Sequence, residues 1–364
     1  MNIKEIAKLA KVSTATVSRT LNRVPTVDPI LARRVWRVVR QVGYYPNTQA
    51  RALGSGRSRV FGLIISEISN PFFPQIVETF VCLGMKHNYE ILLTPVPEDS
   101  REFEAAARRM IERRVEGVAI LTFAKSDSLI QVFGNRKVPV LVIDSAVRGP
   151  LVKTIRVDYH HGMRQAVQHL AALGHVHISF VSGPANLQSA AARKVAFQEC
   201  MNEIGLNTPS ELMVQGNHTM EGGMRAVTHL AALRNRPSAV ICSNDLTAIG
   251  VIREAFELAL DVPRDLSVVG FDDIRLAEFL IPPLTTVQMS QTAIAETAFR
   301  GLLEWVECER SQSSPEAGVI KTNLVLRRST ALAAHRRMNT TSPTEQELAT
   351  ERGRERTETP SAFA

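Results

Sequence analysis

Residues 13–22 combine small, hydroxyl and guanidinium side chains at helical spacing. Ser13 is a good N-cap, and Val17 and Leu21 would give the helix a thin apolar stripe. The opposite face would carry hydroxyls, small side chains and Arg19, which let a helix enter a groove and donate to a guanine edge. The segment therefore favours a helix that reads base pairs, with a small polar surface helix as the alternative interpretation.

A first helix should precede it. Asn2 can cap this helix with Glu5 as the reciprocal partner, and only Lys11 and Val12 separate it from the Ser13 cap. Its expected apolar face consists of Ile3, Ile6, Leu9 and Ala10. Two short helices joined by so tight a turn predict a helix-turn-helix, in which the second helix enters the major groove.

A third helix should begin at Asp28-Pro29 and stop at Gly43. Its inward residues would be Val35, Val38, Val39 and Val42, and its outer face would carry Arg33, Arg34, Arg37 and Arg40. These arginines suit phosphates, although a solvated face is the alternative. Residues 1–59 carry a net charge of +10, whereas the whole chain carries +7. A basic excess confined to one end is typical of a nucleic-acid-binding module joined to a neutral or acidic domain.

Several motifs at fixed spacing resemble the amino-terminal signature of the lactose repressor/galactose repressor (LacI/GalR) family of bacterial transcriptional regulators. They are Ile3-Lys4-Glu5-Ile6-Ala7, Val12-Ser13, Thr16-Val17-Ser18-Arg19, Leu21-Asn22, Gly43-Tyr44-Tyr45-Pro46-Asn47, Ala50-Arg51 and Leu53. The predicted base-reading helix and this resemblance together indicate which residues contact DNA. They are Thr14, Ala15, Thr16, Ser18, Arg19, Asn22, Asn47, Ala50 and Leu53. The expected DNA-binding domain is residues 1–45.

Residues 46–59 are expected to form a hinge helix and linker, because Asn47 to Leu53 has a helical pattern closed by Gly54-Ser55-Gly56. A helix of two turns is unstable alone. The resemblance implies that it orders on DNA beside its twin and that Leu53 wedges into the minor groove, which kinks the duplex. Packing of Leu53 against the module is the alternative.

From Val60 the sequence alternates short apolar runs with amphipathic helices, which indicates parallel sheets covered on both faces. The order restarts near Gly162, so residues 60–334 should form two α/β lobes rather than one sheet. A helix over 293–306 should return to the first lobe, and residues 319–326 should form a final strand in the second. The resemblance implies a two-lobed, periplasmic-binding-protein-like effector and dimerisation domain whose chain crosses between lobes three times. Residues 335–364 have a composition typical of a disordered tail.

Polar residues follow successive predicted strands, and the carboxyl ends of parallel strands are where ligands bind. The residues expected to contact an effector are Phe73, Asp144, Ser189, Arg193, Asn244 and Asp272. Arg193 and Asp272 lead this set, because the family counterpart of Arg193 grips the effector. Asp144 could instead cap a helix or pair across the lobes, and Asp245 is expected to be an N-cap.

This chemistry suits a sugar or another polyol, since an aromatic surface can cover an apolar face and charged groups can bind hydroxyls. His160, His161 and His218 would favour a sugar acid. The expected partners are therefore double-stranded DNA and a small sugar-like effector. A homodimer would match a near-palindromic operator, with a tetramer as the larger alternative.

Other function classes are less consistent with the sequence. The charged start lacks the apolar run of a signal peptide, and no apolar run is long enough to cross a bilayer, so a cytoplasmic protein without membrane contact is expected. Cys82, Cys200, Cys242 and Cys308 form no C-x-x-C pair. No cofactor or metal is expected, because the cluster His169, His175 and His177 has no cysteine or second acid nearby. We find no phosphate loop or nucleophile motif and expect no enzyme. A solute-binding protein of the same clamp fold is the alternative function.

Overall fold

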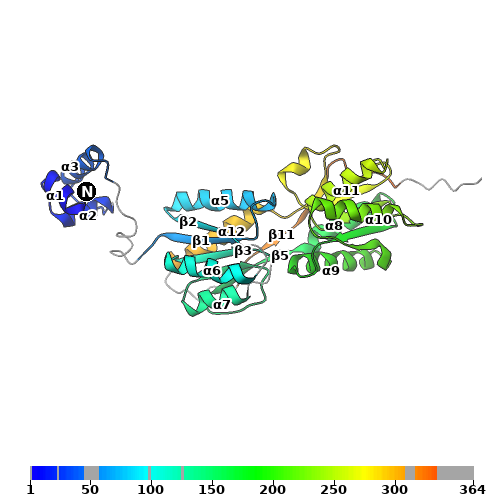
Figure 1. Ribbon diagram of the computed structural model, residues 1–364, viewed down its shortest axis with the longest axis horizontal. Coiled ribbons are helices and arrows are strands. Elements are labelled where there is room, and N and C mark those ends of the chain that lie inside the picture. Colours follow the sequence, from blue (N-terminus) through cyan, green and yellow to red (C-terminus); the bar gives the residue numbers. More distant parts are fainter. Residues whose placement is uncertain are drawn as a thin grey trace, which may run out of the picture.

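The computed structural model describes residues 2–22, 24–44, 57–96, 100–123, 127–307 and 316–333. Its first three helices are α1 (Ile3–Ala10), α2 (Thr14–Leu21) and α3 (Pro29–Gln41), which pack together as one unit (Figure 1). The predicted caps are confirmed. Asn2 and Glu5 form a capping box on α1, Ser13 accepts from the Thr16 N–H on α2, and Asp28 caps α3.

The core of the three-helix unit lies between these helices. It is made of Ile6, Ala7, Ala10, Val17, Leu21, Val35 and Val39. Leu9, which we expected to face inward, is 55% exposed, and Ala7 takes its place in the core. The reason is geometric, because Leu9 lies about 100° around the helix axis from the centre of the face formed by Ile6, Ala7 and Ala10.

The first lobe is built on a sheet whose described strands run in the order β11-β5-β4-β3-β1-β2. The strands are β1 (Val60–Ile65), β2 (Glu90–Pro95), β3 (Gly117–Leu121), β4 (Val140–Ile143), β5 (Val152–Asp158) and β11 (Glu316–Lys321). Helices α5 (Phe72–His87) and α12 (Gln291–Glu307) pack in the hydrophobic cluster on one face. Helices α6 (Ser100–Glu112) and α7 (Asp127–Asn135) cover the other face.

The second lobe repeats this design with strand order β12-β10-β9-β8-β6-β7. Its strands are β6 (Ile178–Ser182), β7 (Met213–Gln215), β8 (Ala239–Cys242), β9 (Ser267–Asp272), β10 (Thr285–Gln288) and β12 (Asn323–Val325). Helices α8 (Tyr159–Ala172) and α9 (Gln188–Glu203) lie on one face, and α10 (Met220–Ala231) and α11 (Asp245–Glu257) lie on the other. Short 3-10 turns, Ser210–Leu212 and Arg275–Glu278, complete the lobe.

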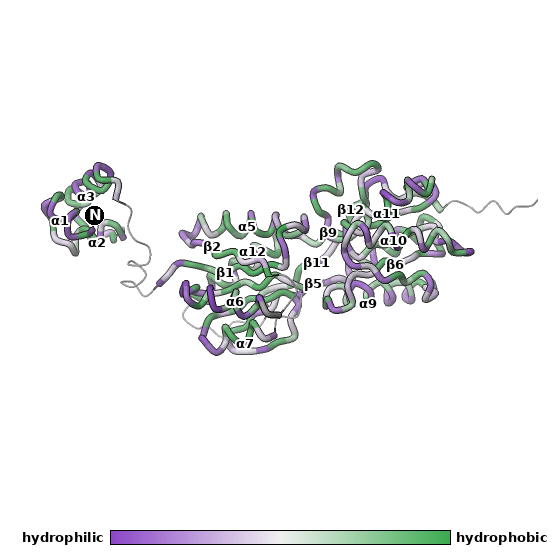
Figure 2. The backbone as a smooth tube through the Cα atoms, viewed as in Figure 1, coloured by the Kyte–Doolittle hydropathy of each residue, from purple (hydrophilic) through white to green (hydrophobic). Residues whose placement is uncertain are grey.

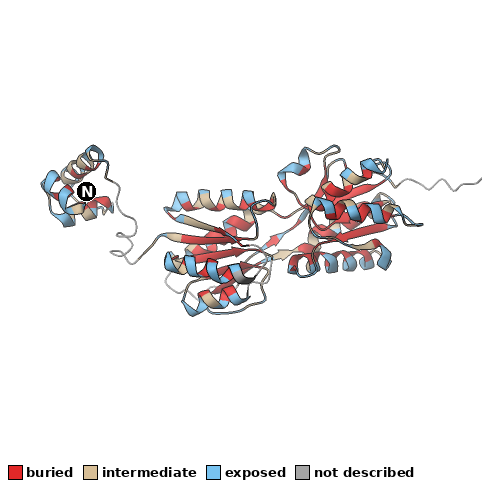
Figure 3. Cartoon of the chain, viewed as in Figure 1, coloured by how far each residue is buried: buried red, intermediate tan, exposed pale blue. Residues whose placement is uncertain are grey.

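Both sheets are covered on both faces, as the uninterrupted apolar runs predicted. The strands are mostly green in Figure 2, where green marks hydrophobic residues, and mostly red in Figure 3, where red marks buried residues. The outer faces of the helices are exposed. Described strand pairs are parallel except β10 with β12. The predicted fold class, a helix-turn-helix unit followed by two α/β lobes, is confirmed. None of the described helices combines the length and the apolar character that crossing a membrane requires.

The connections between the lobes differ from the prediction at two points. Strand β5 was not predicted, and the chain leaves its end for α8. The prediction of a single final strand over 319–326 in the second lobe is wrong. The segment contains parts of two strands, because β11 pairs with β5 in the first lobe and β12 pairs with β10 in the second. Thr322 marks the break, where its hydroxyl donates to the Asp158 carbonyl and accepts from the Gly162 N–H. With the passage from β10 to α12, these connections make the three expected crossings.

Two glycines let α10 and α11 approach closely. A Cβ on Gly250 would lie 1.9 Å from the Met220 carbonyl oxygen, and one on Gly223 would lie 2.1 Å from that of Thr247. The contact positions the amino-terminal ends of both helices, where Thr219 and Asn244 serve as N-caps.

Gly250→Ala should therefore destabilise the second lobe by about 1–3 kcal/mol, because a backbone oxygen cannot move away from the added methyl group without distorting the helix that carries it. The midpoint of thermal or chemical unfolding would measure the loss. Gly134→Ala is the matched control, since Gly134 lies in α7 and its Cβ would meet nothing within 4 Å. That variant should be unchanged or more stable by up to about 1 kcal/mol. Equal stability of Gly250→Ala and the parent would contradict the close helix contact.

Candidate functional site

Helix α2 separates its buried and exposed residues sharply. Val17, Thr20 and Leu21 are buried against the other two helices. The predicted base-reading residues of this segment lie on the accessible side: Thr14, Ala15, Arg19 and Asn22 are exposed, and Thr16 and Ser18 are partly exposed. The helix therefore presents one continuous polar face of small side chains with a single guanidinium.

The start of α2 is held by side-chain hydrogen bonds. Ser13 Oγ accepts from the Thr16 N–H at 3.0 Å and lies 2.9 Å from Thr16 Oγ1. Thr20 Oγ1 donates to the Thr16 carbonyl at 2.8 Å. These bonds fix the first turn of the helix before any partner binds.

Helix α3 adds positive charge beside this face. Arg33, Arg37 and Arg40 are exposed, and Arg34 Nη2 donates to the Lys11 carbonyl at 3.4 Å. Cations at this density suit the phosphates of a duplex, which position a protein without specifying sequence. The other predicted DNA-contacting residues, Asn47, Ala50 and Leu53, lie outside the described residues, as do most of the predicted hinge and the tail.

A cavity of about 180 Å³ lies between the two lobes. From the first lobe it is lined by Ser66, Glu67, Asn70, Phe72, Phe73 and Phe123. From the second lobe it is lined by Pro184, Leu187, Ser189, Arg193, Asn217, His218, Thr219, Asn244 and Asp272. Five of the six residues predicted to contact an effector thus meet in one cavity.

Arg193 and Asp272 form a buried ion pair at the base of this cavity. Arg193 Nη2 donates to Asp272 Oδ1 at 2.9 Å, and Nη1 donates to the Ser243 carbonyl. The guanidinium carbon lies 4.0 Å from the Phe271 ring centroid and 5.5 Å from that of Tyr159. Burial raises the pKa of Asp272 to about 6, and Arg193 opposes that rise.

Two features of the pair are unusual. Arg193 Nε is buried and has no hydrogen-bond partner in the described part of the chain, although buried donors are ordinarily paired. Asp272 has φ of 114°, a conformation that costs a non-glycine residue about 1–3 kcal/mol. Strain of this kind is typical of binding sites, where the rest of the fold holds the residue in place.

His218 forms part of the cavity wall. Its Nε2 lies 2.9 Å from Ser243 Oγ, and Gly183 makes room for the ring, because a Cβ there would lie 1.9 Å from Nε2. Burial, aided by the positive charge of Arg193, lowers the pKa of His218 to about 3. The imidazole is therefore neutral at physiological pH.

Asn244 holds His218 and α11 together. Its Oδ1 accepts from the Thr247 N–H at 3.0 Å, and its Nδ2 donates to the His218 carbonyl at 3.1 Å. The expectation that Asp245 is the N-cap is wrong, because Asn244 is the cap and Asp245 lies inside the lobe. Asp245 accepts from Thr286 Oγ1 at 2.5 Å and from the Ile274 N–H at 2.8 Å.

Asp144 lies apart from the main cavity and lines a smaller adjoining pocket with Ser189. Its oxygens accept from the Val157 N–H at 2.9 Å and from Tyr159 Oη at 2.6 Å. Burial raises its pKa, which the Tyr159 hydrogen bond partly offsets. Because Tyr159 begins α8, Asp144 links the first lobe to the second, which was the alternative to an effector contact.

Some lining residues were missed in the sequence. Phe123 follows β3, one of two early strands whose following residues the prediction left out, and the strand-end rule would have found it. Leu187 and Thr219 lie near helix starts, where polarity gives no signal for a cavity. Two of the three histidines considered for a metal have structural partners. His175 contacts Ser238 Oγ and the Ala331 carbonyl, and His169 Nε2 lies 2.9 Å from Thr330 Oγ1.

Two family models match the chain. Residues 2–47 match bacterial regulatory proteins of the lacI family, and residues 167–330 match a periplasmic binding protein-like domain. The HTH-type transcriptional repressor PurR of Erwinia tasmaniensis is 31% identical over 336 residues, which cover 92% of this chain and 98% of that protein.

Solved structures agree with these matches. The Lac repressor dimer bound to operator and the anti-inducer ONPF has a TM-score of 0.81 at 25% identity, over 91% of this chain and 99% of that one. A complex of the transcriptional regulator CelR with cellobiose has a TM-score of 0.69 at 26% identity, over 90% and 99% of the two chains. The chain therefore belongs to the lacI family of bacterial regulatory proteins and is a DNA-binding transcriptional regulator.

Proposed function

We propose that this protein represses transcription as a homodimer on a near-palindromic operator and that a neutral, sugar-like ligand in the cleft controls it. The observation that carries the DNA-binding part is the division of α2, whose apolar residues are buried while its hydroxyl groups and Arg19 remain exposed. A solute-binding protein has no use for such a helix.

A dimer is supported by the geometry that operator reading requires. A two-fold pair presents two recognition helices to two half-sites, which one helix-turn-helix unit cannot do. Large apolar side chains are also exposed on the effector lobes: Met85 at 73%, Phe279 at 69% and Ile281 at 93%. Phe279 and Ile281 are two residues apart, and large apolar groups exposed together favour contact with a second subunit.

The charges around the cavity favour a neutral ligand. Asp272 compensates the positive charge of Arg193, and His218 is neutral. Glu67 adds a carboxylate on the opposite wall. A sugar acid would therefore meet no unpaired cation among the described lining residues.

The three histidines expected to favour a sugar acid do not place a positive charge in the cavity. Of the three, His218 alone is among the lining residues, and it is uncharged. His160 Nε2 lies 3.2 Å from Glu203 Oε1, and His161 Nε2 lies 3.3 Å from the Gln165 amide nitrogen. Three phenylalanines, Phe72, Phe73 and Phe123, offer an apolar surface, and Asn70 and Ser189 offer polar groups for hydroxyls.

A ligand in this cavity would bridge both lobes and so change their relative placement. Such a change can pass along the first lobe to the DNA-binding unit, because the chain enters β1 directly after the predicted hinge. Linkage is reciprocal, so ligand and operator must alter each other's affinity by the same factor.

Arg19→Ala should weaken binding to an operator selected from random duplexes by about 1–3 kcal/mol, or roughly 5- to 150-fold. Binding to scrambled duplex should change little, because phosphates supply most of that affinity. Fluorescence anisotropy on both duplexes measures the ratio. Arg37→Ala removes the same charge from α3 and is the control; it should weaken both duplexes equally. An unchanged ratio for Arg19→Ala would refute its role in reading bases.

A thermal-shift panel of neutral sugars, polyols and sugar acids tests the ligand class on the full chain. At least one neutral compound should raise the melting temperature, and Arg193→Gln/Asp272→Asn should abolish that shift. The double change removes both charges. Removing only one of them would leave the other buried without a partner, at a cost of about 3–5 kcal/mol. Arg253→Gln/Glu257→Gln removes an exposed pair on α11 and should keep the shift. Shifts from sugar acids alone, or a shift retained by the cleft variant, would contradict the proposal.

A further inference from the structure

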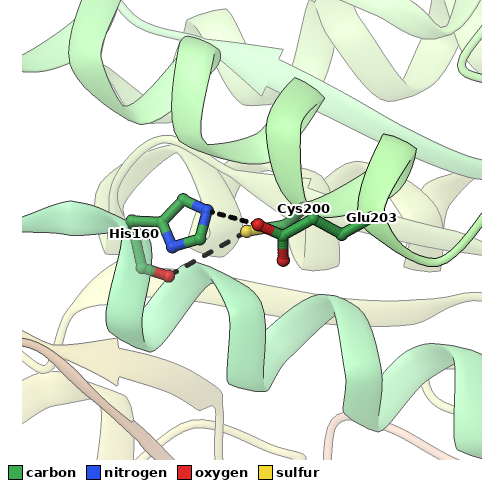
Figure 4. Close-up of side chains that lie close together, drawn as sticks. All are labelled: His160, Cys200 and Glu203. Atoms are coloured by element: carbon green, nitrogen blue, oxygen red, sulfur yellow. Dashed lines mark hydrogen bonds and ion pairs between the residues drawn. The ribbon is translucent and has the colours of Figure 1, made fainter.

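A second cluster of ligating side chains lies where α8 and α9 pack, outside the cleft. Figure 4 shows the His160 ring directed from α8 toward Cys200 and Glu203 on α9. His160 Nε2, Cys200 Sγ and a Glu203 carboxylate oxygen all lie within 4.8 Å of one another. Cys200 and Glu203 are three residues apart on a helix, so they share one face.

We propose that His160, Cys200 and Glu203 bind a divalent transition-metal ion of the zinc class. Imidazole nitrogen, thiolate sulfur and carboxylate oxygen together form the donor set that Zn²⁺ and Co²⁺ take, whereas Mg²⁺ and Ca²⁺ prefer oxygen alone. Bond lengths of about 2.0–2.3 Å place tetrahedral ligand atoms roughly 3.5 Å apart. The three atoms lie within 4.8 Å of one another, so none of their separations has to shorten by more than about 1.3 Å to reach that spacing.

The distances around His160 show where the ion would sit. His160 Nε2 lies 3.2 Å from Glu203 Oε1 and 4.0 Å from Glu199 Oε2. Cys200 Sγ contacts only the His160 carbonyl, at 3.9 Å, among its described hydrogen-bond partners. The thiol is thus buried beside two other potential ligands without a strong partner of its own, and Glu199 or water can fill the fourth position.

Arg164 is the group that could oppose a cation here. Its Nε and Nη2 donate to Glu203 Oε2 and Oε1 at 3.0 and 3.2 Å. Glu203 can keep the Nε bond through Oε2 and turn Oε1 to the metal, so that Arg164 orients the ligand as outer partners commonly do. A thiolate, Glu199 and Glu203 together carry three negative charges, which balance Arg164 and a divalent ion.

Metal binding at Cys200 exchanges one proton for one metal bond. Burial, and next the charge of Glu203, raise the pKa of Cys200 to about 12, so the apo protein holds a thiol. The ion forms an S–M bond as the S–H bond breaks, and the proton leaves to solvent without a redox change. Glu203 and Glu199 have side chains exposed by 41% and 60%, which provides the entry path.

The location gives the site a structural consequence. His160 follows Asp158 and Tyr159, where the chain first crosses between lobes, and α9 also carries Arg193. A bound ion would therefore link the crossing from β5 to α8 with α9, the helix that carries Arg193.

Cobalt titration of the full-length protein, freed of metal and kept reduced, tests the proposal. One equivalent of Co²⁺ should produce the visible bands of a four-coordinate ion and a thiolate-to-cobalt charge-transfer band, and Zn²⁺ should displace both. Cys200→Ser should lose the charge-transfer band, and His160→Gln should weaken binding by at least about tenfold. Cys82→Ser, which alters an exposed cysteine on α5, is the control and should keep the full signal.

Circular dichroism of each variant guards against misfolding, and His160→Gln tests the site with the thiol intact if Cys200→Ser does not fold. Absence of saturable Co²⁺ absorption, or a charge-transfer band that survives in Cys200→Ser, would overturn the assignment. In that case the cluster is an ion-pair network of His160, Glu203 and Arg164 beside a buried thiol.

Discussion

Arg193 and Asp272 are charged groups held at 3% and 5% exposure, and the second lobe is arranged so that neither is left without a partner. A lone buried charge costs several kcal/mol, so each must be placed by rigid elements. Helix α9 supplies the cation, and the end of β9 supplies the carboxylate in a strained backbone conformation. The aromatic rings of Phe271 and Tyr159 enclose the guanidinium, and Ser243 takes one of its donors.

This pair connects the cleft to the lobe crossings. Tyr159, which lies beside Arg193, donates to Asp144 in the first lobe. Asp158 accepts from Thr322, which marks another crossing. A ligand in the cleft would therefore lie next to segments that connect the two lobes. In the three-helix unit, the position of α2 depends on apolar burial instead of a buried ion pair. Val17 and Leu21 fill the core of this unit, and the polar face of α2 is thereby kept exposed.

Features set by local sequence were predicted well. The caps Asn2, Ser13 and Asp28 depend on neighbours within three residues, and the alternation of apolar runs with amphipathic helices predicted the two covered sheets. The carboxyl ends of the predicted strands indicated Phe73, Asn244 and Asp272, and the family resemblance indicated Arg193. These four residues and Ser189 line one cavity. Features set by tertiary contacts were not predictable. Strand β5 carries Lys153, whose burial depends on Glu304 and Trp305 from the distant α12.

The same limit explains the other differences. Asn244 rather than Asp245 caps α11 because Thr286 and Ile274, far along the chain, hold Asp245 inside. The break between β11 and β12 has no glycine or proline to announce it and depends on Thr322 contacting the first crossing. His160 and Cys200 are 40 residues apart, so the absence of a C-x-x-C pair gave no warning of their proximity. Only the packing of α8 on α9 brings them together.

Control of the DNA-binding unit by the cleft is tested most directly by reciprocity. The operator dissociation constant is measured with and without a saturating neutral ligand, and the ligand dissociation constant with and without saturating operator, in one buffer. If ligand binding in the cleft controls operator binding, both dissociation constants change by the same factor, about 5- to 150-fold. A ligand that binds the cleft with the same affinity in the presence and absence of operator would contradict that control.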